Sequence, residues 1–210
     1  MFIPEEIKVQ IYRDMLVQQL LEDQKEIILE DPFLIRHFKY PFEEIQLAAV
    51  NRNGYAIRWI EDPSISVQLA AVSEIGTYIA YIKDPSISVQ LAAVTQDGKA
   101  IQNIKDPSEK VKLVAVNQNG KAIKHIKDPS EEIKLAAVTQ TGYAIEWIKD
   151  PSNSVQLAAV NQNGNAIRWI EDPSEEIKLA AVNRNGNAIE WIEEPSEKVQ
   201  LAAVTIRIGN

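Results

Sequence analysis

The pattern of hydrophobic and polar positions along the chain repeats with a period of 22 residues. Seven full units cover residues 41–194, and an eighth begins at Pro195 and keeps only its first ten positions. Counted from the first residue of each unit, leucine holds position 7, alanine position 9 and valine position 10, and every full unit has isoleucine at positions 17 and 20. Such self-similarity is typical of repeat proteins, in which each unit buries its apolar face against its neighbours.

Proline and glycine divide each unit into two predicted helices. Proline holds position 1 and follows an aspartate in most units, as in Asp106-Pro107, so we predict that the aspartate caps the first helix and that proline is its first residue. Glycine holds position 14 of every full unit, and we predict that it ends this helix with a left-handed conformation at φ > 0. A second, two-turn helix is predicted at about positions 15–21, with alanine 16 and isoleucines 17 and 20 facing the core.

The two ends of the array differ from its middle. Residues 4–30 are predicted to form one long helix or two in tandem, and residues 31–40 match the second half of a unit. After Val204 the sequence carries Ile206 and Ile208 without an obvious polar capping helix, so we predict a self-association surface there. The predicted fold is all-α, an α-solenoid of seven and a half 22-residue two-helix repeats behind an N-terminal helical cap. Its parts are the cap and half-repeat at 1–40, the seven repeats at 41–194, and the terminal half-repeat and tail at 195–210.

The unit that begins at Pro63 departs from this pattern. Ile75 stands where the other units have a polar residue, and Tyr78 replaces the small alanine of position 16. We therefore predict a local irregularity in residues 63–84, either a bend of the stack or a contact with the N-terminal cap.

The unit also resembles a known family. Its letters, DPSEEIKLAAVNRNGNAI at residues 172–189, are similar to those of a 22-residue helical repeat family of unknown function that occurs in viruses, bacteria and protists. The resemblance covers roughly residues 41–204, and it extends more distantly to leucine-rich-variant and HEAT-like α-solenoids. It implies the solenoid fold and, by analogy with helical solenoids in general, a binding scaffold. It implies no catalytic residues.

The residues give little support to enzyme chemistry. The only two histidines, His37 and His125, share one repeat position four units apart, and the chain has no cysteine. Serines and aspartates fall at predicted helix starts, and neither a glycine-rich phosphate loop nor a metal-ligand spacing such as His-Glu-x-x-His occurs. We therefore expect a protein that is not an enzyme, with no catalytic residues, no metal site and no cofactor.

Two variable positions, 15 and 19, are predicted to lie one turn apart on one stripe of the second helix. The stripe is rich in tryptophan, tyrosine and lysine, which suits partner binding. Alternatively, its tryptophans pack between adjacent units. The predicted partner-binding residues are Tyr55, Trp59, Tyr81, Lys99, Lys121, Lys124, His125, Tyr143, Trp147, Trp169 and Trp191.

The charge of the chain is distributed unevenly. The net charge is -8, but residues 85–128 carry a net +3 between segments of net -6 and -5. A solvated surface explains this distribution. Alternatively, the basic centre accepts an acidic protein segment or a phosphate-bearing ligand.

Three functions follow from these features. The leading prediction is a protein-binding module, for which a virus-encoded inhibitor or adaptor is one form. The alternatives are a nucleotide or short nucleic-acid binder, in which Lys99, Lys121, Lys124 and His125 meet phosphate while aromatics stack on bases, and an acidic mimic of nucleic acid. We expect a cytoplasmic protein, in the host cytoplasm if it is viral. No secretion signal and no membrane span are expected.

Overall fold

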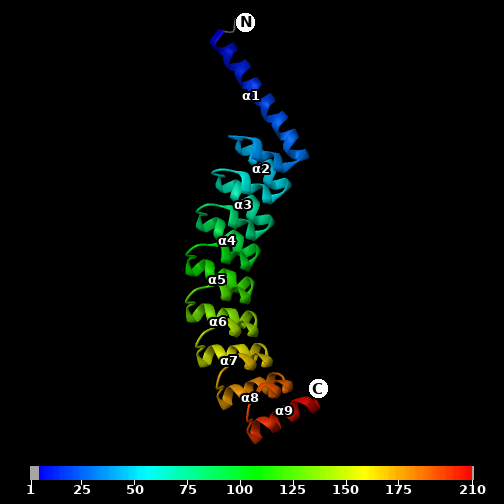
Figure 1. The fold of residues 1–210 in the computed structure, drawn as a ribbon, viewed down its shortest axis with the longest axis vertical. Helices are drawn as coiled ribbons and strands as arrows, with labels where there is room; N and C mark the ends of the chain where they lie inside the picture. The colour runs from blue at the N-terminus through cyan, green and yellow to red at the C-terminus, as the bar shows by residue number, and fades with distance from the viewer. Residues whose placement is uncertain (1–4, 210) are drawn as a thin grey trace. The chain divides into compact units, whose positions relative to one another are not determined.

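The computed structural model describes residues 5–209 and confirms an all-α solenoid (Figure 1). Within the described residues there is no strand, and each layer pairs an α-helix with a shorter 3₁₀ helix, labelled η. The helices are α1 Glu5–Glu30 with η1 Pro32–His37, α2 Glu43–Arg52 with η2 Gly54–Trp59, α3 Ile65–Glu74 with η3 Gly76–Tyr81, α4 Ile87–Gln96 with η4 Gly98–Asn103, α5 Glu109–Gln118 with η5 Gly120–His125, α6 Glu131–Gln140 with η6 Gly142–Trp147, α7 Asn153–Gln162 with η7 Gly164–Trp169, α8 Glu175–Arg184 with η8 Gly186–Trp191, and α9 Glu197–Gly209.

The chain forms two compact units, one up to residue 92 and one from residue 93 onward. In the first unit α1 contacts α2 and α2 contacts α3, and in the second unit consecutive helices from α5 to α9 pack layer on layer (Figure 1). No helix within residues 5–209 combines the length and the apolar run that a membrane crossing requires.

Serine at position 2, and not the preceding aspartate, caps the α-helices from α3 onward, whereas α2 begins after Phe42 without a side-chain cap. The Oγ atom of Ser108 accepts a hydrogen bond from the backbone N–H of Val111, and α5 begins at Glu109. The prediction of an aspartate cap with proline as the first helical residue is therefore wrong. The chain turns sharply before each proline instead, and the residue at this turn has a positive φ of 45 to 48° in Asp62, Asp84, Asp106, Asp128, Asp150, Asp172 and Glu194.

Position 13, and not the glycine of position 14, ends each full-length α-helix of the repeats. Asn119 adopts an extended conformation with φ -150° and is at once the C-cap of α5 and the N-cap of η5, where its Oδ1 atom accepts a hydrogen bond from the Lys121 amide. No glycine among the described residues has a positive φ. The predicted left-handed glycine cap is therefore wrong, because an extended residue reverses the chain before the glycine is reached.

Glycine is required at position 14 because adjacent layers approach closely there. The Gly120 amide donates a hydrogen bond of 2.8 Å to Oε1 of Gln140 in the next layer. A Cβ atom on Gly120 would lie 2.4 Å from the carbonyl oxygen of Ala137, which is shorter than any real Cβ contact. The absence of a side chain, and not backbone freedom, therefore fixes this residue type.

The second helix of each layer is a 3₁₀ helix over positions 14–19, shorter and tighter than the α-helix predicted at 15–21. The predicted inward residues are nevertheless confirmed, because Ala122 and Ile123 are fully buried and Ile126 is nearly so. In a 3₁₀ helix the side chains three residues apart eclipse one another. Positions 15 and 18 therefore share one edge of this helix.

The end structures follow the sequence prediction. The single helix α1 buries Leu21 and Ile28, and η1 lies in register with η2 because each of its residues precedes its equivalent by 22. At the other end α9 exposes 70% of Leu201 and 80% of Ile208. Whether these side chains mediate self-association stays a prediction.

Candidate functional site

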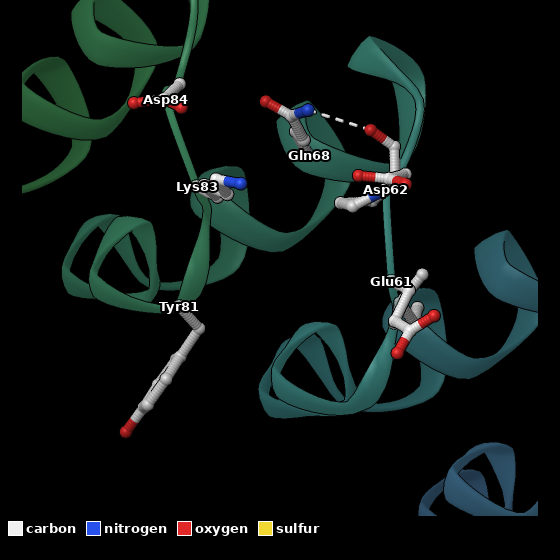
Figure 2. A pocket seen from close by; sticks show the side chains of 8 residues that line it. Glu61, Asp62, Gln68, Tyr81, Lys83 and Asp84 are labelled. Carbon is white, nitrogen blue, oxygen red and sulfur yellow. Dashed lines mark hydrogen bonds between the residues drawn. The ribbon is translucent and has the colours of Figure 1, made fainter.

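A groove recurs at the same place between successive layers. Its walls come from positions 20–22 of one unit and from positions 1, 6, 19 and 21 of the next, and we call it the inter-repeat groove. Figure 2 shows the groove of about 530 Å³ in which the Glu61–Asp62 segment runs beside the Tyr81–Asp84 segment, with Gln68 of α3 between them. Tyr81, at position 19, is among the lining residues, and its ring points away from Gln68 and Lys83 (Figure 2).

The same groove forms at three other places, each with a different residue at position 19. Trp59 lines a groove of about 430 Å³, His125 one of about 440 Å³, and Trp191 one of about 470 Å³. Position 19 is therefore the wall of a site repeated along each compact unit. Because the residue at position 19 varies between units, the grooves are formed by the same repeat positions but carry different side chains.

The residue at position 6 forms the floor of the groove. The Nε2 atom of Gln68 donates a hydrogen bond of 2.8 Å to the carbonyl oxygen of Pro63, and Gln46 makes the equivalent bond to Pro41 (Figure 2). Lysine replaces glutamine in other layers, as with Lys178 in the Trp191 groove. The residue at position 6 is polar in every layer. Where it is glutamine, the hydrogen bond from its side-chain amide holds the proline carbonyl of the loop in place.

Five aromatic rings gather on η1, η2 and η3 in the first compact unit. Tyr55 is central, with ring centroids of 5.3 Å to Trp59, 5.2 Å to Tyr81 and 5.9 Å to Tyr78, and Phe33 lies 5.3 Å from Trp59. Most of these pairs are edge-to-face, the arrangement that favours aromatic contacts. We call these five residues the N-terminal aromatic cluster. Tyr81 keeps 40% of its surface exposed, so the cluster presents an aromatic face to solvent.

A single arginine supplies the polar edge of this cluster. The Nη1 atom of Arg58 donates a hydrogen bond of 2.5 Å to the hydroxyl of Tyr55, three residues earlier. This hydrogen bond is the main reason that the pKa of Tyr55 is lowered, whereas the hydrogen bond between the two tyrosines raises the pKa of Tyr81. The cluster therefore combines rings with a fixed positive charge.

An arginine also organises the aromatic residues of the second compact unit. The guanidinium carbon of Arg168 lies 4.7 Å from the ring centroid of Trp169 and 5.5 Å from those of Trp191 and Tyr143. These distances are within the range of cation–π attraction. We call these four residues the Arg168 cluster. Trp169 is 38% exposed and Trp191 is 50% exposed, so both indoles contact Arg168 and are still accessible.

The predicted basic residues lie in the second unit, on η4 and η5. Lys99, Lys121 and Lys124 are exposed, and His125 is half-buried in the wall of its groove. Burial lowers the pKa of His125, and the nearby Lys124 lowers it further. The histidine is thus biased toward its neutral form.

The structure unites some predicted residues and adds others. Tyr55, Trp59 and Tyr81 meet in one cluster, Tyr143, Trp169 and Trp191 surround Arg168 in another, and Trp147 lies half-buried on η6. Trp59 and Trp191 each contact a side chain of the preceding layer, which agrees with packing between units. That the tryptophans bind a partner stays a prediction.

Several residues that complete these sites were not predicted from the sequence. Position 18 varies as much as positions 15 and 19, and this was the available signal for Arg58 and Arg168. Its importance was hidden because the helix was expected to be α-helical. Also missed were Phe33, Tyr78 as a member of the cluster, and the groove positions 6, 21 and 22.

The unit at residues 63–84 is regular in its backbone. Its helices α3 and η3 begin and end at the same repeat positions as their neighbours, so the helix boundaries show no irregularity. The departure is confined to the side chains, because Tyr78 contacts Tyr55 of the preceding layer and Ile75 makes no side-chain cap for η3.

No group of three or more histidine, cysteine or acidic side chains in the described part of the chain is placed to hold a metal ion. Comparison of the chain with protein-family models, with curated proteins and with solved structures found no match. The grooves and the two clusters are therefore the features of this chain that bear on its function.

Proposed function

We propose that this protein is a non-enzymatic scaffold that binds an extended segment of a partner protein along its inter-repeat grooves. The observation that carries the proposal is the exposure of Trp169 and Trp191 on consecutive layers, both in contact with Arg168, with Trp191 in the lining of a groove. Partly exposed tryptophan and arginine side chains that are held in place dominate the binding energy of protein interfaces.

The backbone that carries these anchors supports the proposal. Trp191 ends η8, between the buried Ala188 and the nearly buried Ile192, so its backbone is anchored to the core on both sides. A side chain that is already ordered loses little conformational entropy when a partner binds. The anchors are therefore suited to binding without a rearrangement of the scaffold.

The exposed lysines of η4 and η5 supply an electrostatic element. Lys99, Lys121 and Lys124 lie in a segment of net positive charge in an otherwise acidic chain. Such charges raise association rates more than they raise affinity. The resemblance to a repeat family found in viruses suggests the more specific form of this proposal, a virus-encoded inhibitor or adaptor in the host cytoplasm.

A selection from a random peptide library tests the proposed function. Peptides enriched on the wild-type protein are expected to lose at least tenfold in affinity when Trp169 and Trp191 are both replaced by alanine. Tyr12→Ala is the matched control, because Tyr12 is an exposed aromatic on α1, outside the grooves. Thermal melting of each variant separates lost binding from lost folding.

The proposal has a clear contrary result. If the enriched peptides bind the folded double variant as tightly as the wild type, the exposed tryptophans are not the anchors. A purified protein that carries nucleotide absorbance, or that binds single-stranded nucleic acid more tightly than any selected peptide, would also contradict it.

A further inference from the structure

The surfaces of the protein restrict how it can hold an extended segment. Residues 5–209 include no strand, so a ligand cannot bind there by extending a sheet. The groove beside Trp191 is lined by the charged side chains of Glu171, Asp172, Lys178 and Glu193, so it lacks the apolar surface that an amphipathic helix needs. Aromatic walls with polar surroundings match the third common mode, recognition of a polyproline II segment.

The spacing of the aromatic side chains fits such a segment. Trp169 and Trp191 hold the same position in consecutive layers, and the Arg168 guanidinium carbon lies 4.7 Å and 5.5 Å from their centroids, so the centroids are at most 10.2 Å apart. Polyproline II rises ~3.1 Å per residue, so every third residue recurs after ~9.3 Å. One residue in three would therefore meet one layer.

The first compact unit gives a similar limit from different residues. The Tyr55 centroid lies 5.3 Å from that of Trp59 and 5.2 Å from that of Tyr81, so the two position-19 rings are at most 10.5 Å apart. Alternate residues of a β-strand would recur after only ~6.7 Å, and two turns of an α-helix after ~10.8 Å. The α-helical spacing exceeds both limits, whereas the spacings of a β-strand and of polyproline II both lie under them. Since residues 5–209 offer no strand for a β-ligand to pair with, polyproline II is the favoured conformation.

The charge of the groove beside Trp191 indicates which side chains a polyproline II ligand would carry between its prolines. Its lining holds three acidic side chains, Glu171, Asp172 and Glu193, against Arg168 and Lys178. The last repeats and the tail, residues 129–210, also carry a net charge of -5. Arginine or lysine in the ligand would pair with these carboxylates and also be attracted to the indole faces.

We infer that the partner segment bound by the repeats around Trp169 and Trp191 is proline-rich, adopts polyproline II, and carries basic residues between its prolines. This inference rests on the proposed function and names the class of partner. Prolines at every third position lie against the position-19 walls. The carbonyl groups of the segment, which polyproline II leaves without internal hydrogen bonds, accept hydrogen bonds from donors such as the indole N–H.

Tryptophan fluorescence gives a direct test, because all four tryptophans of the protein are position-19 residues. A peptide of four Pro-Pro-Arg triplets is expected to change the emission in a saturable way. A peptide of Ala-Ala-Arg triplets keeps the charge and loses the conformation, and a peptide of Pro-Pro-Glu triplets keeps the conformation and reverses the charge. Both are expected to bind at least tenfold more weakly.

Variants then locate the binding site. With a labelled Pro-Pro-Arg peptide in an anisotropy assay, Trp191→Ala is expected to reduce affinity at least tenfold, Trp191→Phe to reduce it less, and Tyr12→Ala to leave it unchanged. Trp191→Phe also keeps the test valid if the alanine variant does not fold. Equal binding of the Ala-Ala-Arg peptide, or full affinity of folded Trp191→Ala for the Pro-Pro-Arg peptide, would overturn the inference.

The two proposals fail in different ways. If library peptides depend on Trp169 and Trp191 but lack prolines three residues apart, the scaffold function stands and the proline-rich partner is rejected. If neither the library peptides nor the Pro-Pro-Arg peptide depends on these tryptophans, the scaffold function itself is rejected.

Discussion

The backbone amide of Gly120 donates its hydrogen bond to the side chain of Gln140, 20 residues later and one layer further along the stack. Equivalent bonds join Gly98 to Gln118 and Gly142 to Gln162, at 2.7 and 2.6 Å. This hydrogen bond requires the backbones of adjacent layers to lie close enough for the side-chain oxygen of Gln140 to reach the glycine N–H. A Cβ atom on Gly120 would prevent that approach.

Gly120→Ala should therefore destabilise the protein by about 2 kcal/mol or more, within the range of overpacked cores. Gly54→Ala is the matched comparison. Its Cβ would meet side-chain atoms of Glu74 and Tyr78, which can move, whereas Gly120 faces the backbone carbonyl of Ala137. Denaturant unfolding of both variants checks the order, and equal losses would show that backbone proximity is not the cause.

The turn before each proline gives a second prediction. Asp128 has a φ of 47°, a region that asparagine and aspartate enter more readily than serine. Asp128→Asn should retain nearly all the stability, whereas Asp128→Ser should lose ~1 kcal/mol. The aspartate-cap prediction from the sequence implies instead that serine is tolerated, so denaturant unfolding of the two variants decides between them.

Features of the fold that repeat periodically in the sequence could be predicted, whereas features that depend on a choice between neighbouring residues or on a contact with the next layer could not. Burial is periodic, so the register of the repeats and the core residues at positions 17 and 20 were found. Cap identity was missed because Asp-Pro-Ser offers two capping residues in succession, and the structure uses Ser108 rather than Asp106. The glycine was misinterpreted because its reason lies in the next layer, in a contact that local propensity does not contain.

The two kinds of position-19 tryptophan should differ in their effect on stability. Trp59 is half-buried against Phe33 and Tyr55, so Trp59→Ala should cost about 2–3 kcal/mol, below the loss for a fully buried tryptophan. Trp191 is 50% exposed, and Trp191→Ala should cost ~1 kcal/mol or less. Unfolding of Trp191→Ala at room temperature, seen by circular dichroism, would make this side chain structural.

His125 gives a prediction for pH. Its pKa in the folded state is lowered, first by burial and then by Lys124, so protonation favours the unfolded chain. The associated stability is present above the ordinary value of 6.5 and is lost as the pH falls below it. His125→Asn places the residue of the preceding repeat, Asn103, at this position.

Denaturant unfolding at pH 7.5 and at pH 5.5 measures this effect. The stability of the wild type should fall more between the two pH values than that of His125→Asn. An equal fall in both proteins would show that other groups account for the pH dependence.

The exposed side chains of α9 give a prediction for self-association. Leu201, Val204 and Ile208 recur at spacings of three and four residues, which places them on one face of the helix. Replacing Leu201 and Ile208 by glutamine should lower the weight-average mass in sedimentation equilibrium at high concentration. The same replacement of Ile7 and Ile11 on α1 is the control, and a loss of mass only there would contradict the prediction.

The candidate site was only partly predictable, for reasons of geometry. The rings at position 19 were found because positions 7, 9, 10, 17 and 20 are invariant between the units whereas position 19 varies. The arginines of position 18 were missed because 3₁₀ geometry, which aligns residues three apart, brings Arg58 to Tyr55. The grooves were missed because their walls combine two units, and a comparison of single units does not place such residues together.

The hydrogen bonds between layers also have a consequence for how the chain reaches this structure. Ser152 bonds Glu131 and Gly142 bonds Gln162, so the partners are only 21 and 20 residues apart. Chains dominated by such short separations have low contact order and fold in microseconds to milliseconds, because each step closes only a short loop. Duplication of residues 129–150 would give each of these bonds an equivalent partner in the new neighbour, because the copy again carries Glu131, Gln140 and Gly142 at the same repeat positions. An array of this design can therefore gain length without losing its architecture.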